Sequence, residues 1–588
     1  MKQFFKVVFA SMLGFILANI LLLFLFIAII GGIAASSGSK KTAEIDENSI
    51  LKIEFSGPIS DRSDNNPFKN FNPLSGENKQ GYGLTDILEA LEKAKTDDKI
   101  KGIYMHFDGV PAGMATTEEI RNALLDFKKS GKFILSYSNT YDQKAYYISS
   151  VADSIMVHPE GGLDFRGLSA SVMFLKGAME KLEVEPQIIR HGKFKSAIEP
   201  LILDKMSDAN REQTSTYLNA LWNRMLDGIS TARKISVQEL TAMADQALIR
   251  NPKDALKYKL IDKLAYEDEV QASLRKRLGI EEKDKIKFVS LGKYFETPSD
   301  EAKAKEKVAI IYASGDIVDG EGSDDNVGGD KIAATIRKAR LDEKVKAIVL
   351  RVNSPGGSAL ASDIMWREVI LAKKVKPVVV SMGDVAASGG YYISCAADRI
   401  FASPNTITGS IGVFGVLINT KKLFNNKLGI TIDTVKTNKF ADMGASYRPL
   451  TDTERDIIQQ GVEEVYQTFI THVGEGRKMA TANVDSIGQG RVWAGTDAKK
   501  INLIDEFGGL KDAIAYAAKK AKLEKYRVVG YPEQEEPFKK FMKQVSGEGE
   551  EAIIKAQLGN NYEYYRKIKR ALQIEGIQAR IPYELEVY

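Results

Sequence analysis

Short apolar runs alternate with longer amphipathic stretches along most of this chain. Residues 346–352 (KAIVLRV) are almost continuously apolar, which is typical of a strand buried on both faces. Residues 362–373 then read as an amphipathic helix, and residues 377–381 (PVVVS) predict the next buried strand. Strands that are separated by helices indicate βαβ units and a mostly parallel sheet, so the predicted fold class is α/β.

The same order of elements occurs earlier, in residues 102–107, 118–129 and 133–136. The two regions also match in sequence, because DDKIKGI at 97–103 aligns with DEKVKAI at 342–348. The tetrapeptide YYIS at 146–149 recurs at 391–394 with the same offset. A constant offset over about 100 residues indicates an internal duplication.

The duplication predicts two tandem domains of similar fold. The charged stretch SDEAKAKE is the expected linker, and the segment after it repeats the first half. The end of the chain has no counterpart in the first half, and its sequence leaves its structure open. The expected parts are an N-terminal segment (1–47), a first domain (48–298), a linker (299–306), a second domain (307–543) and a C-terminal tail (544–588).

The N-terminal segment has the pattern of a membrane anchor. No charged residue occurs from Val7 to Ser39, and residues 7–35 are almost all apolar or small. A transmembrane helix needs about 20 such residues, whereas the apolar core of a cleaved signal peptide has about 7–15. We therefore expect one transmembrane helix, although the small residues at 34–37 leave cleavage open. Basic residues on its two sides differ little in number, and we favour the N-terminus inside and the rest of the chain outside.

Composition excludes several classes of function. The 588 residues include 82 basic and 78 acidic side chains without a basic block, so a nucleic-acid partner is not expected. Four scattered histidines and one cysteine form no metal-binding motif, and nothing in the sequence implies a cofactor.

The two halves differ at the positions that matter for chemistry. The second half has DVAASGG at 384–390, where the first half has NTYDQKA, so Ser388 aligns with Gln143. The second half also has NSPGGS at 353–358, which is replaced in the first half. Glycines allow tight turns that aim backbone N–H groups at an oxyanion, and a serine hydroxyl is a nucleophile when a base lies beside it.

The first half supplies the candidate base. Its stretch KFKSAIEP places Lys195 opposite Ala441 of the second half, so each half lacks what the other provides. Because a lysine base works best with a pKa far below about 10.4, Lys195 should be enclosed by apolar surface.

Two other residues could take a catalytic role. His191 precedes Lys195 by four residues, and in an extended stretch both side chains would point the same way. Cys395 lies in YYISCAAD, where a small buried core residue is the simpler interpretation. Tyr391 and Tyr392 recur in the half that lacks the serine, which favours a packing role.

The motifs NSPGGS, GDVAASGGYYIS, TGSIGVFG (408–415) and GKFKSAIEP (192–200) together resemble the long form of the signal peptide peptidase A family, also called protease IV, of peptidase family S49. The resemblance covers about residues 51–529 and the N-terminal anchor. It implies two Clp/crotonase-like domains of ββα repeats and a serine protease with a Ser/Lys dyad.

By this resemblance, Ser388 is the nucleophile and Lys195 is the base. Ser410 is expected to hydrogen-bond the lysine, and the backbone N–H groups of Gly357 and Gly389 are expected to form the oxyanion hole. The resemblance also implies a homotetramer at the outer (periplasmic) face of the cytoplasmic membrane that degrades cleaved signal peptides and other unfolded apolar peptides.

Two further functions stay open from the residues alone. A crotonase-type acyl-CoA enzyme would share the scaffold but would need a carboxylate acid or base in place of the Ser/Lys pair. A catalytically inactive membrane scaffold would need neither, and the presence of both residues argues against it.

Overall fold

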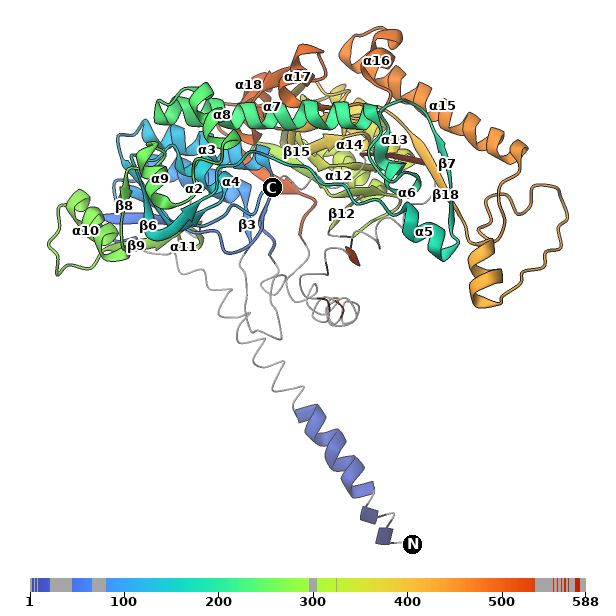
Figure 1. Ribbon diagram of the computed structural model, residues 1–588, viewed down its shortest axis with the longest axis horizontal. Helices are drawn as coiled ribbons and strands as arrows, with labels where there is room; N and C mark the ends of the chain where they lie inside the picture. Colours follow the sequence, from blue (N-terminus) through green and yellow to red (C-terminus); the bar gives the residue numbers. More distant parts are fainter. Residues whose placement is uncertain are drawn as a thin grey trace.

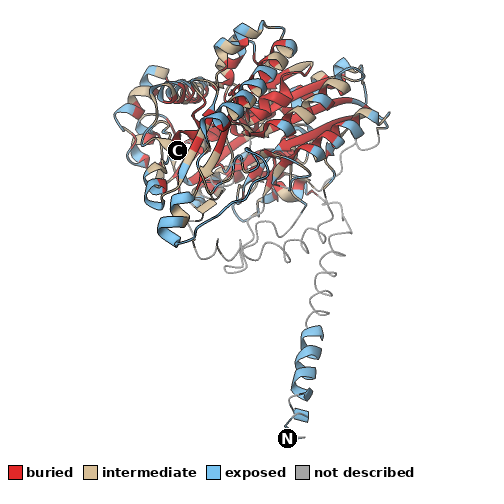
Figure 2. Cartoon of the chain, turned by 90° about the vertical axis from the view of Figure 1, so that its right-hand side faces the viewer, coloured by how far each residue is buried: buried red, intermediate tan, exposed pale blue. Residues whose placement is uncertain are grey.

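The computed structural model describes residues 9–21, 45–65, 81–295, 304–323, 325–534 and 577–581, with isolated residues among 3–7 and 554–569. Most of the expected linker and of the expected C-terminal tail lies outside these residues. Strands and helices alternate throughout, which confirms the α/β class. Buried strands fill the interior, and helices with exposed outer faces surround them (Figure 2).

The first half is built on one parallel sheet with the strand order β8-β6-β5-β4-β1-β9. Its strands are β1 (Ser49–Ile53), β4 (Ile100–Met105), β5 (Phe133–Tyr141), β6 (Ser154–Leu163), β8 (Lys263–Leu264) and β9 (Lys287–Ser290). A short pair, β2 (Ile59–Ser60) and β3 (Tyr82–Gly83), lies apart from it. The helices are α2 (Leu84–Thr96), α3 (Met114–Lys128), α4 (Gln143–Ser149), α5 (Lys176–Leu182), α6 (Glu199–Ile202), α7 (Asp208–Arg233), α8 (Val237–Asp245), α9 (Pro252–Lys257), α10 (Glu267–Leu278) and α11 (Leu291–Phe295).

The second half repeats this sheet. Its strands run β20-β16-β15-β13-β10-β21, all parallel, and β17 and β19 extend the far end of β15. The strands are β10 (Lys307–Ser314), β13 (Val345–Ser354), β15 (Val378–Ala387), β16 (Arg399–Ala402), β17 (Ile407–Gly409), β19 (Val492–Ala494), β20 (Glu506–Phe507) and β21 (Arg527–Tyr531). The helices are α12 (Gly329–Leu341), α13 (Ala359–Lys373), α14 (Gly389–Ser394), α15 (Asp452–Arg477), α16 (Thr481–Ile487), α17 (Gly495–Lys500) and α18 (Leu510–Lys520).

Corresponding elements confirm that the chain is duplicated. Helices α3 and α13 begin at aligned positions of the two repeats, and so do strands β5 and β15. Equivalent tyrosines make equivalent bonds: the Tyr146 hydroxyl donates to the Leu260 carbonyl, and the Tyr391 hydroxyl donates to that of Leu503. These buried tyrosines pack both cores, as the sequence predicted.

The predicted helices and strands occur, but β5 and β15 run several residues further than their apolar patterns. Strand β15 continues through Gly383 and Asp384, which are poor strand formers. The extension is held from outside, because its last residues pair with β17. Tertiary pairing therefore overrides local propensity and carries the strand to the residue before Ser388.

A third sheet joins the halves. Its order is β12-β11-β14-β22-β18-β7, and its strands are β7 (Glu185–Arg190), β11 (Asp316–Val318), β12 (Asn326–Gly328), β14 (Gly356–Ser358), β18 (Phe414–Asn419) and β22 (Ile577–Arg580). Strand β7 of the first half pairs antiparallel with β18 of the second half along its whole length. The long helix α7 runs from the first half toward the second (Figure 1) and contacts β19 there.

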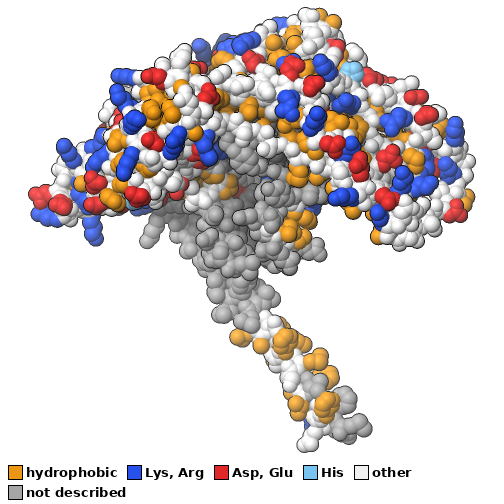
Figure 3. All heavy atoms as spheres, viewed as in Figure 1, with side chains coloured by type: hydrophobic (Ala, Val, Ile, Leu, Met, Phe, Trp, Pro, Cys, Tyr) orange, Lys and Arg blue, Asp and Glu red, His pale blue; other side chains and the backbone are white. Residues whose placement is uncertain are grey.

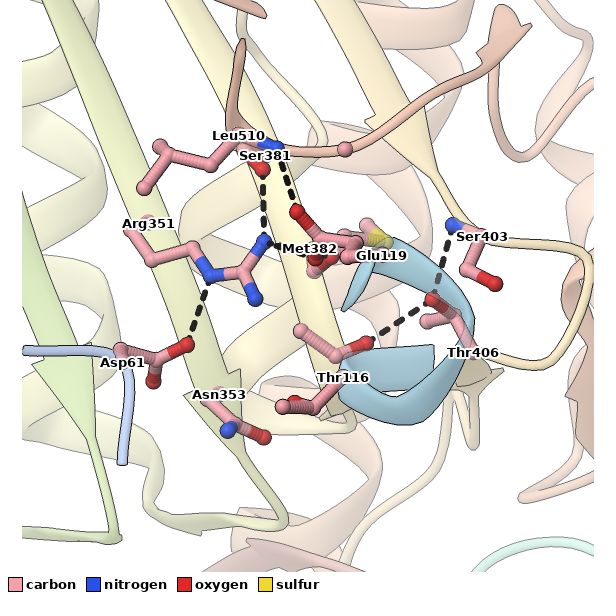
Figure 4. Close-up of polar contacts among 12 residues, drawn as sticks. Asp61, Thr116, Glu119, Arg351, Asn353, Ser381, Met382, Ser403, Thr406 and Leu510 are labelled. Carbon is pink, nitrogen blue, oxygen red and sulfur yellow. Dashed lines mark hydrogen bonds and ion pairs between the residues drawn. The ribbon is translucent and has the colours of Figure 1, made fainter. Parts of the chain in front are cut away.

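A buried charge cluster also connects the halves. Figure 4 shows Arg351 on β13 between Asp61 of the first half and Ser381 on β15. Its Nε donates to Asp61 at 2.7 Å, and its Nη1 lies 2.8 Å from Glu119 of the first half. Burial alone would raise the pKa of Asp61, but the Arg351 charge and hydrogen bonds outweigh it and hold that pKa below its ordinary value. The contact between the halves therefore includes a buried ion-pair cluster, and loss of one partner would leave the others buried and uncompensated.

At the N-terminus, residues 9–21 form a helix that stands away from the body of the protein (Figure 1). Among the described residues, no helix combines the length and the apolar character that crossing a bilayer requires. The apolar stretch that the sequence analysis assigned to the anchor continues through residues 22–35, which lie outside the described part of the chain.

Candidate active site

Ser388 lies in the sharp turn between β15 and α14. Its backbone has φ 54° and ψ −113°, a conformation that L residues with a Cβ rarely adopt. The turn is held on both sides, since the Ser388 N–H donates to the Gly409 carbonyl at 2.8 Å and its carbonyl accepts from Tyr392 N–H. This strand–turn–helix geometry fixes the direction in which the hydroxyl points.

Lys195 reaches the same place from the first half. It follows β7 and precedes a short 3-10 helix (Ser196–Ile198), and the neighbouring Phe194 N–H donates to the Gln489 carbonyl at 2.9 Å. Gly490, with φ 82°, lies directly against it: a Cβ at Gly490 would come within 2.6 Å of the Lys195 backbone. Only a glycine lets this second-half loop pack so closely on the lysine.

The structure brings the lysine and the two serines together. Lys195 Nζ lies 2.8 Å from Ser388 Oγ, 3.1 Å from Ser410 Oγ and 3.2 Å from the Ser410 carbonyl oxygen. All three side chains are fully buried. The arrangement joins groups that are 193 and 215 residues apart in the chain.

Burial determines the ionisation of the lysine. It holds the pKa of Lys195 well below the ordinary value of a lysine, because removal from water penalises the ammonium form. No carboxylate is bonded to Lys195 or Ser388 among the described residues, and the Phe414 ring lies 5.9 Å from Nζ. A neutral amine that accepts a proton from Ser388 is the form that this pocket favours, whereas crotonase-type chemistry would need a carboxylate here.

Gly357 lies on β14 and Gly389 begins α14, and these two segments meet beside Ser388. A Cβ at Gly357 would stand 1.9 Å from the Ile317 carbonyl oxygen, and one at Gly389 would stand 2.6 Å from Ser362 Oγ. A Cβ at Gly356 would meet the Gly389 nitrogen at 2.7 Å. A larger residue at Gly357 would therefore meet the Ile317 backbone, and one at Gly389, at the N-terminus of α14, would have to displace the Ser362 side chain.

The alternative catalytic residues are placed elsewhere. His191 Nδ1 lies 2.6 Å from Glu463 Oε2, and its ring stacks on Tyr466. The chain from 191 to 195 is a turn and not a strand, so the even spacing does not align His191 with Lys195. Cys395 is fully buried and bonds to the Tyr392 carbonyl, and burial raises its pKa to about 12, which keeps the thiol protonated.

Sequence reasoning missed three contributors to the site. Gly490 and Phe414 enclose Lys195, and residues 577–581 lie beside Gly357. Gly490 stands in the short motif GQGR, which alone does not differ from an ordinary turn. Within the described residues, no group of His, Cys, Asp and Glu could hold a metal ion.

Comparison with known proteins places this geometry in context. The family model described as "Peptidase family S49" matches the chain twice, at residues 126–281 and 370–524. Each half of the chain carries one match, in agreement with the duplication.

Three relatives match over most of the chain. "Protease 4" of Salmonella typhi is 39% identical over 88% of this chain and 85% of its own length. "Serine protease SPPA, chloroplastic" of Arabidopsis thaliana is 34% identical over 91% and 78%, and "Protease 4" of Haemophilus influenzae is 34% identical over 84% and 83%.

Proposed function

Because the chain belongs to peptidase family S49 and is a serine protease, we propose that it cleaves peptide bonds with Ser388 as nucleophile and Lys195 as general base. The observation that carries this proposal is the 2.8 Å contact between Lys195 Nζ and Ser388 Oγ in a fully buried pocket. A neutral lysine at hydrogen-bond distance can activate a serine that would otherwise be a weak nucleophile.

The reaction proceeds in two steps. Ser388 Oγ attacks the carbonyl carbon of the substrate while Lys195 takes the hydroxyl proton. The resulting ammonium then gives that proton to the leaving amine as the C–N bond breaks, and an ester on Ser388 remains. Water attacks this ester with Lys195 again acting as base, which releases the acid and restores Ser388.

The surrounding groups assist each step. The N–H groups of Gly357 and Gly389 stabilise the oxyanion of each tetrahedral intermediate, since β14 and the start of α14 meet beside Ser388. Ser410, at 3.1 Å, orients the amine toward Ser388 without providing charge.

Labelling with a fluorophosphonate probe tests the nucleophile. The parent protein should be labelled, whereas Ser388→Ala and Lys195→Ala should not. Ser394→Ala is the matched control, because Ser394 is another fully buried serine on α14 and bonds only to the Gly390 carbonyl among the described contacts. Labelling that persists in Ser388→Ala would reject Ser388 as the nucleophile.

The substrates are unfolded apolar peptides, in particular cleaved signal peptides. The support is the family resemblance and the pairing of β14 with β22, because an extended segment already binds through its main chain beside Gly357 in the way that a peptide substrate would. A mixture of apolar and charged peptides of equal length tests the preference, and equal turnover of both would reject it.

The N-terminal segment anchors the protein in the cytoplasmic membrane, with the catalytic domains in the periplasm. The described helix 9–21 exposes large apolar side chains (Figure 3), including Phe15 at 71% and Leu21 at 72%. Such a surface favours an apolar surrounding. The full chain should remain in the membrane fraction after carbonate washing, and protease added to spheroplasts should digest it.

Two exposed segments support a ring of copies. Val435 of the second half occupies the position of Ile189 on β7, yet Val435 is 98% exposed whereas Ile189 is 2% exposed. Ile189 pairs with Gly415 on β18, whereas the first-half counterpart of β18, residues 169–174, is exposed or half-exposed. The strand pairing that joins the two halves can therefore repeat head-to-tail between copies of the chain. If the rotation closes, such contacts give a ring. The family resemblance implies that this ring has four subunits.

Light scattering tests the ring. Val435→Asp should lower the molar mass of the detergent-solubilised assembly. Val375→Asp, at a 63% exposed position just after α13, is the matched control and should not. An unchanged mass for Val435→Asp would reject this interface.

A further inference from the structure

The carboxamide of Gln213 lies where the segment around the base meets the second half of the chain. Gln213 is in the second turn of α7 and is 1% exposed. Its Nε2 donates to Ser196 Oγ at 2.8 Å and to the Phe194 carbonyl at 3.1 Å, and its Oε1 accepts from the Val492 N–H at 3.1 Å. One buried side chain therefore binds the residues on both sides of Lys195 and a strand of the other half.

Local secondary structure does not hold Lys195 in place. Its φ of −74° and ψ of 80° belong to neither a helix nor a strand, and it stands directly before the short 3-10 helix. A long side chain on such a segment stays aimed only if groups from elsewhere hold its main chain. The Phe194 carbonyl and the Ser196 hydroxyl adjoin Lys195, and Gln213 binds both. The amide therefore fixes the direction in which Lys195 leaves the main chain.

The acceptor side of the same amide is linked to the nucleophile. Val492 on β19 pairs with Gly409 on β17, and the Gly409 carbonyl accepts the Ser388 N–H at 2.8 Å. A chain of contacts thus runs from the residues beside Lys195, through Gln213 and two paired strands, to the main chain of Ser388. The 2.8 Å distance between Lys195 Nζ and Ser388 Oγ depends on the register along this chain of contacts.

The duplication separates this amide from the requirements of the fold. Helices α7 and α15 are counterparts, because each has 26 residues, follows a hydroxyl N-cap and ends at a lysine in the left-handed conformation. Their alignment places Ile457 opposite Gln213. Ile457 is 41% exposed and belongs to the half that has Ala441 in place of Lys195. The helix therefore forms without the carboxamide, which occurs once, beside the lysine.

We infer that Gln213 is a positioning residue for the base: its carboxamide holds the main chain around Lys195 so that the amine stays enclosed and aimed at Ser388. This inference rests on the proposed function. Gln213 takes no part in proton transfer, since each hydrogen bond that the structure gives its amide is to a group beside the site. Without the amide, the lysine segment separates from the loop around Gly490, water reaches the amine, and the ammonium form is no longer penalised by burial.

Kinetics of Gln213→Met on an apolar peptide ester test this role. The variant keeps most of the side-chain length and loses the hydrogen bonds. We expect kcat to fall about 10²-fold, as for a displaced catalytic group, and KM to change less than about twofold, because each bond that is lost lies within the protein. The midpoint of the kcat/KM profile should rise by about one pH unit toward the ordinary lysine value. A loss of folded enzyme would lower kcat without moving this midpoint.

Two further variants separate positioning from folding. Ser196→Ala removes one of the two groups that Gln213 holds beside the base, so it should move the midpoint in the same direction by a smaller amount. Gln213→Met combined with Ser196→Ala should move it no further than Gln213→Met alone. Ile229→Ala is the matched control, because Ile229 is fully buried on α7 about four turns beyond Gln213. It should lower the Tm and leave the pH midpoint unchanged.

The inference and the proposed function fail separately in these experiments. If Gln213→Met keeps the parent kcat and midpoint while Ser388→Ala is inactive, the inference is wrong and the proposed function stands. A fall in kcat with an unmoved midpoint would also overturn the inference, since it would show a role in folding alone. If the parent shows no hydrolysis that depends on Ser388 and Lys195, both are wrong.

Discussion

The same position carries opposite roles in the two halves of this protein. In the second half, Ser388 Oγ lies 3.4 Å from the Gly412 carbonyl and faces Lys195. In the first half, its counterpart Gln143 donates to the Gly167 carbonyl at 2.8 Å, and its Oε1 accepts from Arg166 N–H and Gly167 N–H. In the first half the Gln143 amide thus occupies its loop with hydrogen bonds. In the second half Ser388 leaves the equivalent loop available for chemistry.

The expected oxyanion hole shows the same contrast. Gly357 and Gly389 correspond to Ala112 and Lys144 of the first half. There the Lys144 ammonium donates to the Ala112 carbonyl at 2.9 Å and bridges the two loops. The first-half site is thus filled by its own side chains, so the duplicated scaffold keeps its packing while losing room for a substrate.

The segments that carry Lys195 and its counterpart differ in their strand pairing. Lys195 is buried because β7 pairs with β18 and carries the following turn onto the serine half. Its counterpart Ala441 lies on an exposed segment that pairs with no strand in the described part of the chain. One complete site therefore forms where the two halves meet, because each supplies one member of the pair.

The largest expected effect comes from removing either member of the pair. Ser388→Ala and Lys195→Ala should each lower kcat by about 10⁴-fold or more, and the double variant should lose no more than either single one, since the two act as a unit. Lys195→Arg should be as inactive, because a guanidinium stays protonated and cannot accept the serine proton.

Steady-state kinetics on an apolar peptide ester measures these losses, and circular dichroism checks the fold. An active Lys195→Arg enzyme would rule out lysine as the base and return attention to His191.

The next effect is on pH dependence. The proposed mechanism needs the neutral amine, so kcat/KM should rise about tenfold per pH unit below the lowered pKa of Lys195 and then level off well below pH 10. The folded protein binds fewer protons than the unfolded chain between that pKa and the ordinary lysine value near 10.4, so the free energy of unfolding should increase with pH across this window. Lys195→Met should lack this stability slope. A pH-rate profile that is flat from about pH 6 to 10 would contradict the lowered pKa.

A smaller effect is expected for Ser410. Ser410→Ala removes one hydrogen bond to the amine and leaves its burial unchanged, so kcat/KM should fall roughly tenfold without abolition. The same pH-rate profile shows whether the midpoint moves. A loss as large as that of Lys195→Ala would mean that Ser410 does more than position the base.

The smallest expected effect tests the comparison from the other side. Introducing the serine motif into the first half, by Gln143→Ser with Lys144→Gly and Ala145→Gly, should create no second active site, because no lysine base reaches that loop. The fluorophosphonate probe in a Ser388→Ala background measures this directly. The variant should also unfold more easily, since Arg166 N–H and Gly167 N–H lose their shared acceptor. Labelling of the serine introduced by Gln143→Ser would contradict the division between halves.

Much of the fold follows from local patterns. Apolar runs such as residues 346–352 and 377–381 predict their strands, since a strand buried on both faces can be read from its own residues. The constant offset between the repeats predicts that two sheets share one strand order. The alignment of the two repeats also predicts the positions at which they differ, Ser388 and Lys195 among them. The structure brings these two residues together, with Ser410 beside them.

The sequence by itself therefore determined the class of fold, the duplication and the identity of the residues that meet. Only the tertiary structure decided how they meet: the pairing of β7 with β18, the enclosure of Lys195 by Gly490 and Phe414, and the placing of Ala579 beside Gly357. The physical reason is that periodicity and motifs report on neighbours along the chain. Desolvation of an amine and the pairing of a C-terminal strand depend instead on surfaces that come from distant segments and exist only after folding.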